Sequence, residues 1–408
     1  MSSRFRNMLA VTSVLIFFTN WPDYAHVRLG ILVPNQWVFG LGLLALPLMT
    51  RQITGSDILR SPVVIWCFGY AWVTMLWFLG SSQSDVAWQV VRWRFLSIVE
   101  LFLFLTIFSK QEANKMARQA LVIAVLAGVL IQVYELFFPM SFSEVLGRSA
   151  GLYMNPNAAG TALVTGMICS VTVLPLRYRV GFIVLTGIGV MASISRGSIL
   201  AWGTSVVGLA AIGRVRLKDI VVTGFLGLVV VMAMLIPQWD TVVSTLEKTG
   251  SINKNVEERL AWLTDPSGVS DQSSWARMYV AKRAWDMIEE KPIWGSGTGS
   301  SYEAELAPHN QSLAFMQDHG VLGVLILPLL LLAVTLSSTG EHRRTTILFS
   351  GSVMLLSFFS HDLLSQSHTL LLLALAATMF KEKNHPAPDS PWGAPEYSRG
   401  DVPTFELV

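Results

Sequence analysis

The sequence has 408 residues, of which 52% are hydrophobic and only 14% are charged, and its formal net charge is +2. A soluble protein carries about 25% charged residues, so this composition excludes a chain made of two or three soluble domains. The small net charge gives no sign of a nucleic-acid partner. We therefore expect an all-α, polytopic membrane protein.

Apolar runs recur along the chain, each near the roughly 20 residues that a helix needs to cross hydrocarbon. The first follows Arg4 and Arg6, and we interpret it as a membrane helix because no small-x-small signal-peptide cleavage site follows it. The runs predict about twelve transmembrane helices. They lie near residues 8–21, 31–49, 62–80, 92–108, 118–138, 158–174, 180–195, 197–213, 218–236, 309–336, 345–360 and 366–380.

These runs divide the chain into four parts. Residues 1–236 hold helices one to nine, and 237–308 form a large loop with amphipathic helices between helices nine and ten. Residues 309–380 hold the last three helices. Residues 381–408 are rich in Pro, Asp, Ser and Gly, which predicts a disordered tail.

Basic residues predict the orientation, because cytoplasmic connections are enriched in Lys and Arg. With the N-terminus inside, every inner connection is basic. The inner set is Arg4, Arg6, Arg51, Arg60, Lys110, Lys115, Arg118, Arg177, Arg179, Arg214, Arg216, Lys218, Arg343, Arg344, Lys381 and Lys383. The short outer connections hold Arg28, Arg92, Arg94, Arg148 and Arg196. We therefore expect both termini in the cytoplasm and the large loop in the periplasm of a cell inner membrane.

The large loop contains a predicted amphipathic helix from Ser274 to Glu290. Its apolar residues at helical spacing are Trp275, Met278, Trp285 and Ile288. Two interpretations stay open: the helix lies on the membrane surface, or it packs this face on the bundle. Either interpretation places the helix over the outer end of the protein. The segment 291–299 that follows has three alternating glycines and is interpreted as a flexible turn.

Three residues are candidates for chemistry on the outer side. Arg196 lies between two closely spaced apolar runs, where an arginine either pairs with an anion such as phosphate or snorkels to the interface. Arg277 belongs to the amphipathic helix and by itself reads as a solvated charge. His309 begins the tenth run; a histidine there titrates near neutrality and can accept a proton from a hydroxyl, although a lone histidine is more often structural.

Other polar residues give weaker signals. Glu100, Glu135, His361 and Asp362 are each candidates to line a polar cavity, and the sequence does not rank them. Cys67 and Cys169 lie within apolar runs and read as core residues. No metal-ligand spacing and no nucleotide-binding fold is visible, so an enzyme here is expected to act outside the cell membrane, without metal, cofactor or ATP, on a lipid-borne substrate.

Together these segments resemble the O-antigen ligase and polymerase family of bacterial membrane glycosyltransferases. At residue level the resemblance covers about 150–320. The matching pieces are Gly151–Asn157, Ser195-Arg-Gly-Ser198, the Arg277 helix, Pro292 with Gly295-Ser-Gly297, and His309-Asn310 followed by Asp318 and Gly320. In the last piece Asp318 stands where the family is expected to have glutamate.

The resemblance implies inverting transfer of a glycan from undecaprenyl diphosphate to an acceptor hydroxyl at the periplasmic face. Arg196 and Arg277 would bind the donor diphosphate, and His309 would orient or deprotonate the acceptor. A ligase uses lipid A–core as acceptor in lipopolysaccharide biosynthesis, whereas a polymerase uses the next lipid-linked repeat; we favour the ligase. A transporter or flippase is the alternative from another class, although no internal repeat supports it.

Overall fold

The computed structural model describes residues 3–55, 57–235, 272–303 and 307–379, and within these ranges the chain is helical without strands. The first helices are α1 (Ser3–Ser13), η1 (Val14–Phe18), α2 (Trp21–Leu29), α3 (Pro34–Gly55), η2 (Asp57–Arg60), α4 (Pro62–Leu79), α5 (Asp85–Phe108) and α6 (Gln111–Phe137). They continue with η3 (Gly151–Tyr153), α7 (Pro156–Ser170), η4 (Val171–Val173), α8 (Leu176–Ala192), α9 (Arg196–Ala211) and α10 (Leu217–Leu235). The C-terminal helices are α13 (Gln272–Glu290), α14 (Ser300–Glu303), α15 (Gln311–His319), η6 (Gly320–Leu325), α16 (Ile326–Ser337), α17 (His342–Leu356), η7 (Leu363–Ser365) and α18 (Ser367–Ala377).

The predicted all-helical class is confirmed, and a described helix coincides with each predicted apolar run. By length and composition, four helical stretches of the described residues qualify as membrane spans: Pro62–Leu79, Gln111–Phe137, Pro156–Val173 and Gln311–Ser337. The chain is therefore an integral membrane protein, and the count of twelve crossings stays a prediction. Most of the first half of the large loop and the predicted tail lie outside the described residues.

Side-chain caps explain where several helices begin. Asn155 accepts hydrogen bonds from the backbone N–H groups of Asn157 and Ala158, and Pro156 occupies the first turn of α7. Asn310 caps α15 in the same way. A polar side chain that accepts from the first N–H groups satisfies donors that have no partner inside the helix. Two of the asparagines in the matching pieces therefore begin helices.

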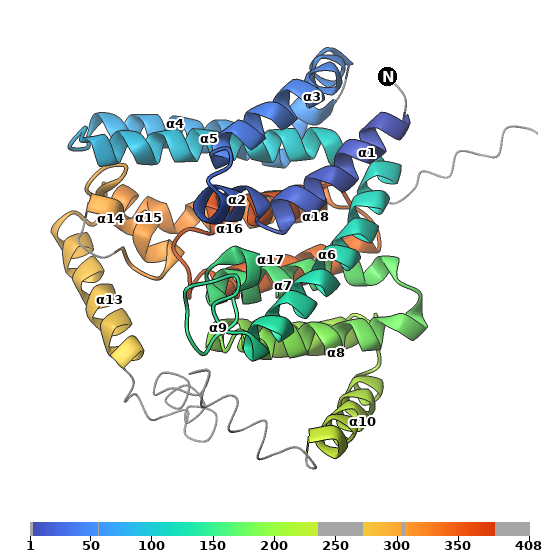
Figure 1. The fold of residues 1–408 in the computed structure, drawn as a ribbon. Coiled ribbons are helices and arrows are strands. Elements are labelled where there is room, and N and C mark those ends of the chain that lie inside the picture. The colour runs from blue at the N-terminus through green and yellow to red at the C-terminus, as the bar shows by residue number, and fades with distance from the viewer. Residues whose placement is uncertain (1–2, 56, 236–271, 304–306, 380–408) are drawn as a thin grey trace, which may run out of the picture.

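The helices alternate between two ends of the bundle, and the connections expected on one side of the membrane lie together (Figure 1). At one end the α4–α5 turn meets α14, where Ser82 donates to Glu303. At the other end Arg214 donates to the backbone oxygen of Glu341 over 2.7 Å. We call these the outer and the inner end, following the predicted orientation.

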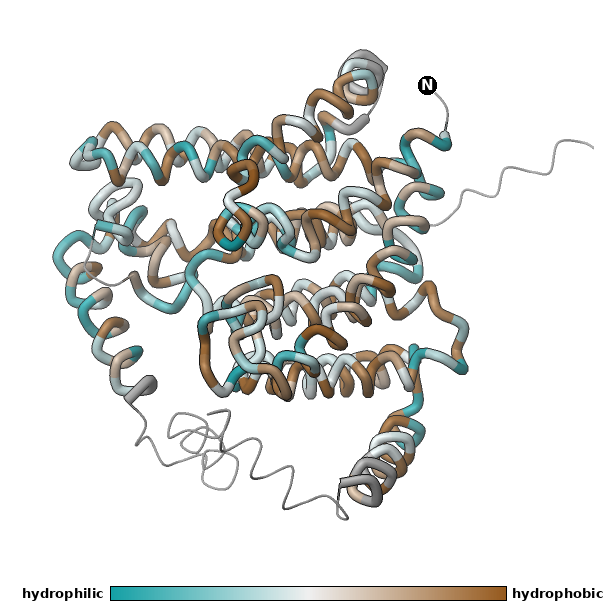
Figure 2. Tube along the Cα trace, in the orientation of Figure 1, coloured by the Kyte–Doolittle hydropathy of each residue, from teal (hydrophilic) through white to brown (hydrophobic). Residues whose placement is uncertain are grey.

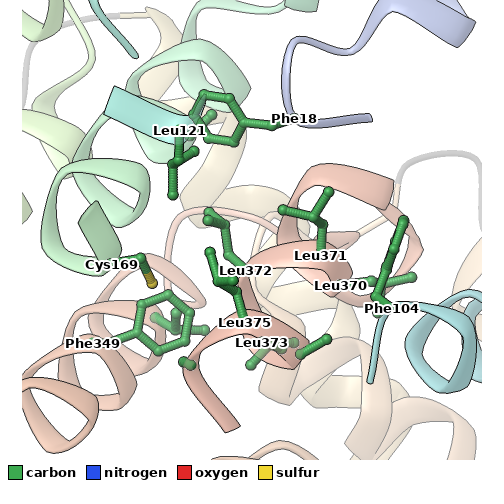
Figure 3. Close-up of a cluster of buried hydrophobic side chains, with 14 of the residues drawn as sticks. Phe18, Phe104, Leu121, Cys169, Phe349, Leu370, Leu371, Leu372, Leu373 and Leu375 are labelled. Atoms are coloured by element: carbon green, nitrogen blue, oxygen red, sulfur yellow. The ribbon is translucent and has the colours of Figure 1, made fainter. Parts of the chain in front are cut away.

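The core surrounds α18, in which every residue from His368 to Ala377 is buried. Figure 3 shows the leucines of α18 between Phe104 on one side and Cys169 and Phe349 on the other. Both cysteines are free and buried, as predicted from the sequence. A helix that is buried on all sides lies inside a bundle, so α18 is a central helix of this one.

Candidate active site

The predicted amphipathic helix is present as α13 and lies across the outer end of the bundle, with hydrophilic residues along much of its length (Figure 2). Of the two interpretations that the sequence left open, the structure does not support packing of the Trp275 and Trp285 face on the bundle. Val280, Ala284 and Ile288 are buried, whereas Trp275 and Trp285 are 58% and 47% exposed. Small side chains allow α13 to approach α15 closely, and the large aromatic residues point outward. Only Ile288 of the four residues expected on the apolar face is buried.

The glycine segment after α13 is a tightly packed connection, which corrects the expectation of a flexible turn. Gly297 has φ +97°, and a Cβ added there would lie 2.5 Å from the Cα atom of Ser81. A Cβ added at Gly295 would lie 2.6 Å from the backbone oxygen of Asp318. The backbone N–H of Gly297 donates to that same oxygen over 3.0 Å. Glycine is required here because the backbone adopts positive φ and touches two neighbours directly.

Asp318 joins the glycine segment to the bundle. It is fully buried, and its carboxylate accepts from the backbone N–H of Ser301 over 2.8 Å and from the hydroxyl of Ser300 over 3.0 Å. It also forms an ion pair with Arg94 of α5. Arg94 reaches Nε2 of His319 over 2.7 Å. Asp318, where the family resemblance expects glutamate, therefore connects α14, α15 and α5.

Arg94 corrects one assignment made from the sequence. It was expected in an outer connection, but it lies within α5 and is only 6% exposed. Its guanidinium carbon is 5.6 Å from the ring centroid of Phe315 and 5.8 Å from that of Tyr70. A buried arginine needs such partners, because an unpaired charge in a low-dielectric environment is costly.

His309 lies at the outer end, exposed, immediately before the cap of α15. Its ring centroid is 5.7 Å from that of His361, which lies in the loop between α17 and α18. The ring of His361 is in turn 5.8 Å from that of Tyr302 on α14. Three segments of the chain therefore converge here, and His361, which the sequence did not rank, adjoins the predicted catalytic histidine.

Electrostatics keep His309 in the form that accepts a proton. His309 lies outside the membrane-spanning stretch, which begins at Gln311. Partial burial lowers the pKa of the His309 imidazole, the charges of His361 and Arg277 lower it further, and Asp362 opposes these effects. A lowered pKa means that the ring is neutral at neutral pH. Arg277 is therefore within electrostatic range of His309.

Arg196 is the first residue of α9, and its neighbour Gly197 packs against the loop after α17. A Cβ added at Gly197 would lie 2.6 Å from the ring of Phe359, two residues before His361. The turn before α9 is held by Arg148, which donates to the backbone oxygen of Ser193 over 3.1 Å. The start of α9 therefore lies beside the loop that carries His361 and Asp362.

A small pocket lies beside His361, between α4, α5, α14 and α15. Its lining includes Tyr70, Trp93, Arg94, Tyr302 and His361. The rings of Trp93 and Tyr302 meet edge to face with centroids 5.7 Å apart. Burial raises the pKa of Tyr302, so its hydroxyl stays protonated. The pocket offers aromatic surface and hydrogen-bonding groups next to the two histidines.

The two glutamates differ in role. Glu135 accepts from four backbone N–H groups, those of Phe142, Ser143, Ala150 and Gly151, over 2.7–3.2 Å. It therefore fixes the loop after α6. Glu100 is buried in α5 beside Ser367.

Asp362 accepts from Ser360 over 2.5 Å and from Gln366 over 2.9 Å, which holds the loop that carries His361.

The arrangement combines a neutral imidazole with guanidinium groups at one end of an apolar bundle. In a comparison with known protein families, residues 181–328, from within α8 to the first turn of α16, match the O-antigen ligase family. No curated protein matches the chain. The matched region contains Arg196, Arg277 and His309, so the resemblance found from the sequence pieces is confirmed over this part of the chain.

Proposed function

From this similarity to the O-antigen ligase family over residues 181–328, we propose that the protein transfers a glycan from undecaprenyl diphosphate to an acceptor hydroxyl at the periplasmic face of the inner membrane. The family match supports glycosyl transfer of the O-antigen ligase type over the transporter alternative. The favoured acceptor is lipid A–core.

One observation carries the proposal: the rings of His309 and His361 lie 5.7 Å apart at the outer end of the bundle, within electrostatic range of Arg277 and Asp362. A transferase of this kind needs positive charge for a diphosphate leaving group and a base for a hydroxyl. Both are present at the end of the bundle where a lipid-linked donor would present its headgroup. Arg196 adjoins the site through Gly197 and Phe359.

The proposed reaction is a single displacement. The acceptor oxygen attacks the anomeric carbon of the donor glycan from the face opposite the diphosphate, and the new C–O bond inverts that centre. The acceptor proton passes to His309, and the electrons of the broken C–O bond go to undecaprenyl diphosphate. Arg196 and Arg277 stabilise the charge that develops on the diphosphate by charge-assisted hydrogen bonds.

Asp362 has a supporting role in this scheme. Its negative charge favours the protonated form of His309, which forms as the hydroxyl loses its proton. Arg277 works in the opposite direction and keeps the imidazole neutral before the reaction. Burial and the charges of His361 and Arg277 outweigh Asp362 and place the pKa of His309 below its ordinary value, which suits a base that works near neutral pH.

The test is a reconstituted assay in EDTA, with the protein in nanodiscs, a lipid-linked glycan donor, and lipid A–core as acceptor. We expect glycan on lipid A–core and release of undecaprenyl diphosphate. Elongation of the lipid-linked glycan instead would identify a polymerase. Absence of both products, with donor and acceptor intact, would contradict the proposal, and loss of activity restored by magnesium would contradict the metal-independent mechanism.

A further inference from the structure

A large cavity lies at the inner end of the bundle, between α8, the end of α9 and the start of α10, away from the candidate active site (Figure 1). Its volume is about 850 Å³. Arg177, Arg214 and Arg216 line it beside apolar side chains such as Leu176 and Leu217. The site therefore presents cationic groups and hydrocarbon surface to the same space.

The lining has a net positive charge, because Asp219 is its one carboxylate against three arginines. Within the described part of the chain, neither Arg177 nor Arg216 forms an ion pair. Arg177 lies over the ring of Tyr178, with its guanidinium carbon 4.6 Å from the ring centroid. Stacking of this kind leaves the guanidinium edge available to an anion.

Arg214 adds an unsatisfied donor. Two of its nitrogens interact with Glu341, one with the backbone oxygen over 2.7 Å and one with the carboxylate over 3.7 Å. Its Nε atom is buried and has no hydrogen-bond partner among the described residues. The two nitrogens that contact Glu341 hold the guanidinium of Arg214 at the wall of the cavity.

Other cations crowd the same end. Arg179 donates to the backbone oxygen of Arg214 over 3.1 Å. Burial and the charges of Arg118 and Arg214 lower the pKa of His342, which places these three groups within electrostatic reach. Like charges at short range repel each other, and a bound anion relieves that repulsion.

Apolar surface continues from the cavity toward the hydrocarbon. Leu176 and Leu217 at its rim are 69% and 45% exposed, and Val221 and Phe225, further along α10, are 63% and 64% exposed. In Figure 1 α10 inclines away from the bundle, so this surface is open to the side. A ligand that fits must have a phosphate near the arginines and acyl chains along α10.

We propose that this cavity binds an anionic phospholipid of the adjacent leaflet, with the phosphate held by Arg177, Arg214 and Arg216. Basic pockets between transmembrane helices at the cytoplasmic side are suited to such headgroups. The bound lipid fills the space between α8, α9 and α10 and fixes the start of α10, the helix that leads into the large loop. The site is independent of the glycosyl transfer reaction.

Native mass spectrometry of the full chain in detergent tests the proposal with phosphatidylglycerol and phosphatidylethanolamine of identical acyl chains. The test variant is Arg177→Gln/Arg216→Gln, which leaves Arg214 and its contacts with Glu341 in place. The matched control is Arg343→Gln/Arg344→Gln, which removes the same charge from exposed positions at the same end, outside the cavity. Unfolding temperatures measured without added lipid verify that both variants are folded.

We expect the wild type and the control to bind phosphatidylglycerol in preference to phosphatidylethanolamine. The cavity variant should lose roughly 10- to 30-fold in affinity, the effect of two arginines near a lipid phosphate. Equal binding of both lipids by the wild type, or an equal loss in the control, would overturn the proposal. Displacement of the lipid by inorganic phosphate or glycerol 3-phosphate would show a site for soluble phosphate and would overturn it as well.

Discussion

Arg94 of α5 and Asp318 of α15 form a buried ion pair that ties the outer end of the bundle together. Asp318 also accepts from Ser300 and Ser301, while Arg94 reaches His319. The pair thereby joins α14, which carries Tyr302, to two core helices. The position of the site over the bundle depends on this connection.

The two partners are expected to respond differently to mutation. Asp318→Asn leaves a buried cation without its carboxylate and should destabilise the protein by about 3–5 kcal/mol. Arg94→Met should cost less, because the Asp318 carboxylate keeps three other donors. The double variant should be more stable than Asp318→Asn alone, since no buried charge remains. Unfolding in detergent measures this, and simple addition of the two losses would argue against the pairing.

The glycine segment gives a second stability test with a matched control. Gly297 and Gly213 have φ +97° and +73°, but an added Cβ at Gly213 meets nothing within 4 Å. Gly213→Ala should therefore lower the free energy of unfolding by only roughly 1–2 kcal/mol, which is the cost of a left-handed backbone for alanine. Gly297→Ala should lose about 1–3 kcal/mol more, because the new methyl group meets Ser81. Equal losses in thermal unfolding would show that the segment is not tightly packed.

The pH dependence of transfer tests the base. If the neutral imidazole of His309 accepts the proton, kcat/KM falls as pH drops through its pKa, which lies below the ordinary value. Asp362→Asn removes a charge that raises this pKa and should move the acid limb to lower pH. Arg277→Gln removes a charge that lowers it and should move the limb to higher pH.

Lys282→Gln is the control for these two variants, because Lys282 is exposed on α13 and does not act on His309. Its acid limb should coincide with that of the wild type. If Asp362→Asn and Arg277→Gln shift the limb in the same direction, or not at all, then another group limits the rate at low pH.

Cysteine labelling in cells with a permeabilised outer membrane tests the orientation. Lys291 is exposed at the outer end and Arg343 at the inner end. Because the native cysteines are buried, the background should be low. An impermeant thiol reagent should label Lys291→Cys and leave Arg343→Cys unlabelled. The opposite result would reverse the predicted topology.

Hydropathy and basic residues predicted the helical class and the grouping of connections, because both follow from local composition. The Arg94–Asp318 pair was missed. An arginine near the end of an apolar run looks the same whether it snorkels or pairs with a carboxylate more than 200 residues away. The sequence did not decide which face of α13 packs on the bundle, because large apolar residues suit a membrane surface as well as a protein core, whereas Val280 and Ala284 fit the neighbouring helix. The glycines were misread because their φ angles and contacts arise only on folding.

The most specific chemical expectation concerns Arg196. A guanidinium binds diphosphate through two parallel hydrogen bonds that a lysine cannot reproduce. Arg196→Lys should therefore lose nearly as much donor binding and transfer as Arg196→Ala. Arg277→Lys should be milder, because positive charge near His309 is retained. Native transfer by Arg196→Lys would show that Arg196 acts only as a charge at the membrane surface.

The most direct test of the proposed division of labour is to measure donor binding and glycan transfer together in His309→Ala, with Arg196→Ala for comparison. A general base contributes about 10² to 10⁴-fold to a rate. His309→Ala should therefore reduce transfer by that factor and bind undecaprenyl diphosphate like the wild type, whereas Arg196→Ala should lose donor binding. Loss of donor binding in His309→Ala as severe as in Arg196→Ala would contradict the assignment of His309 as the base.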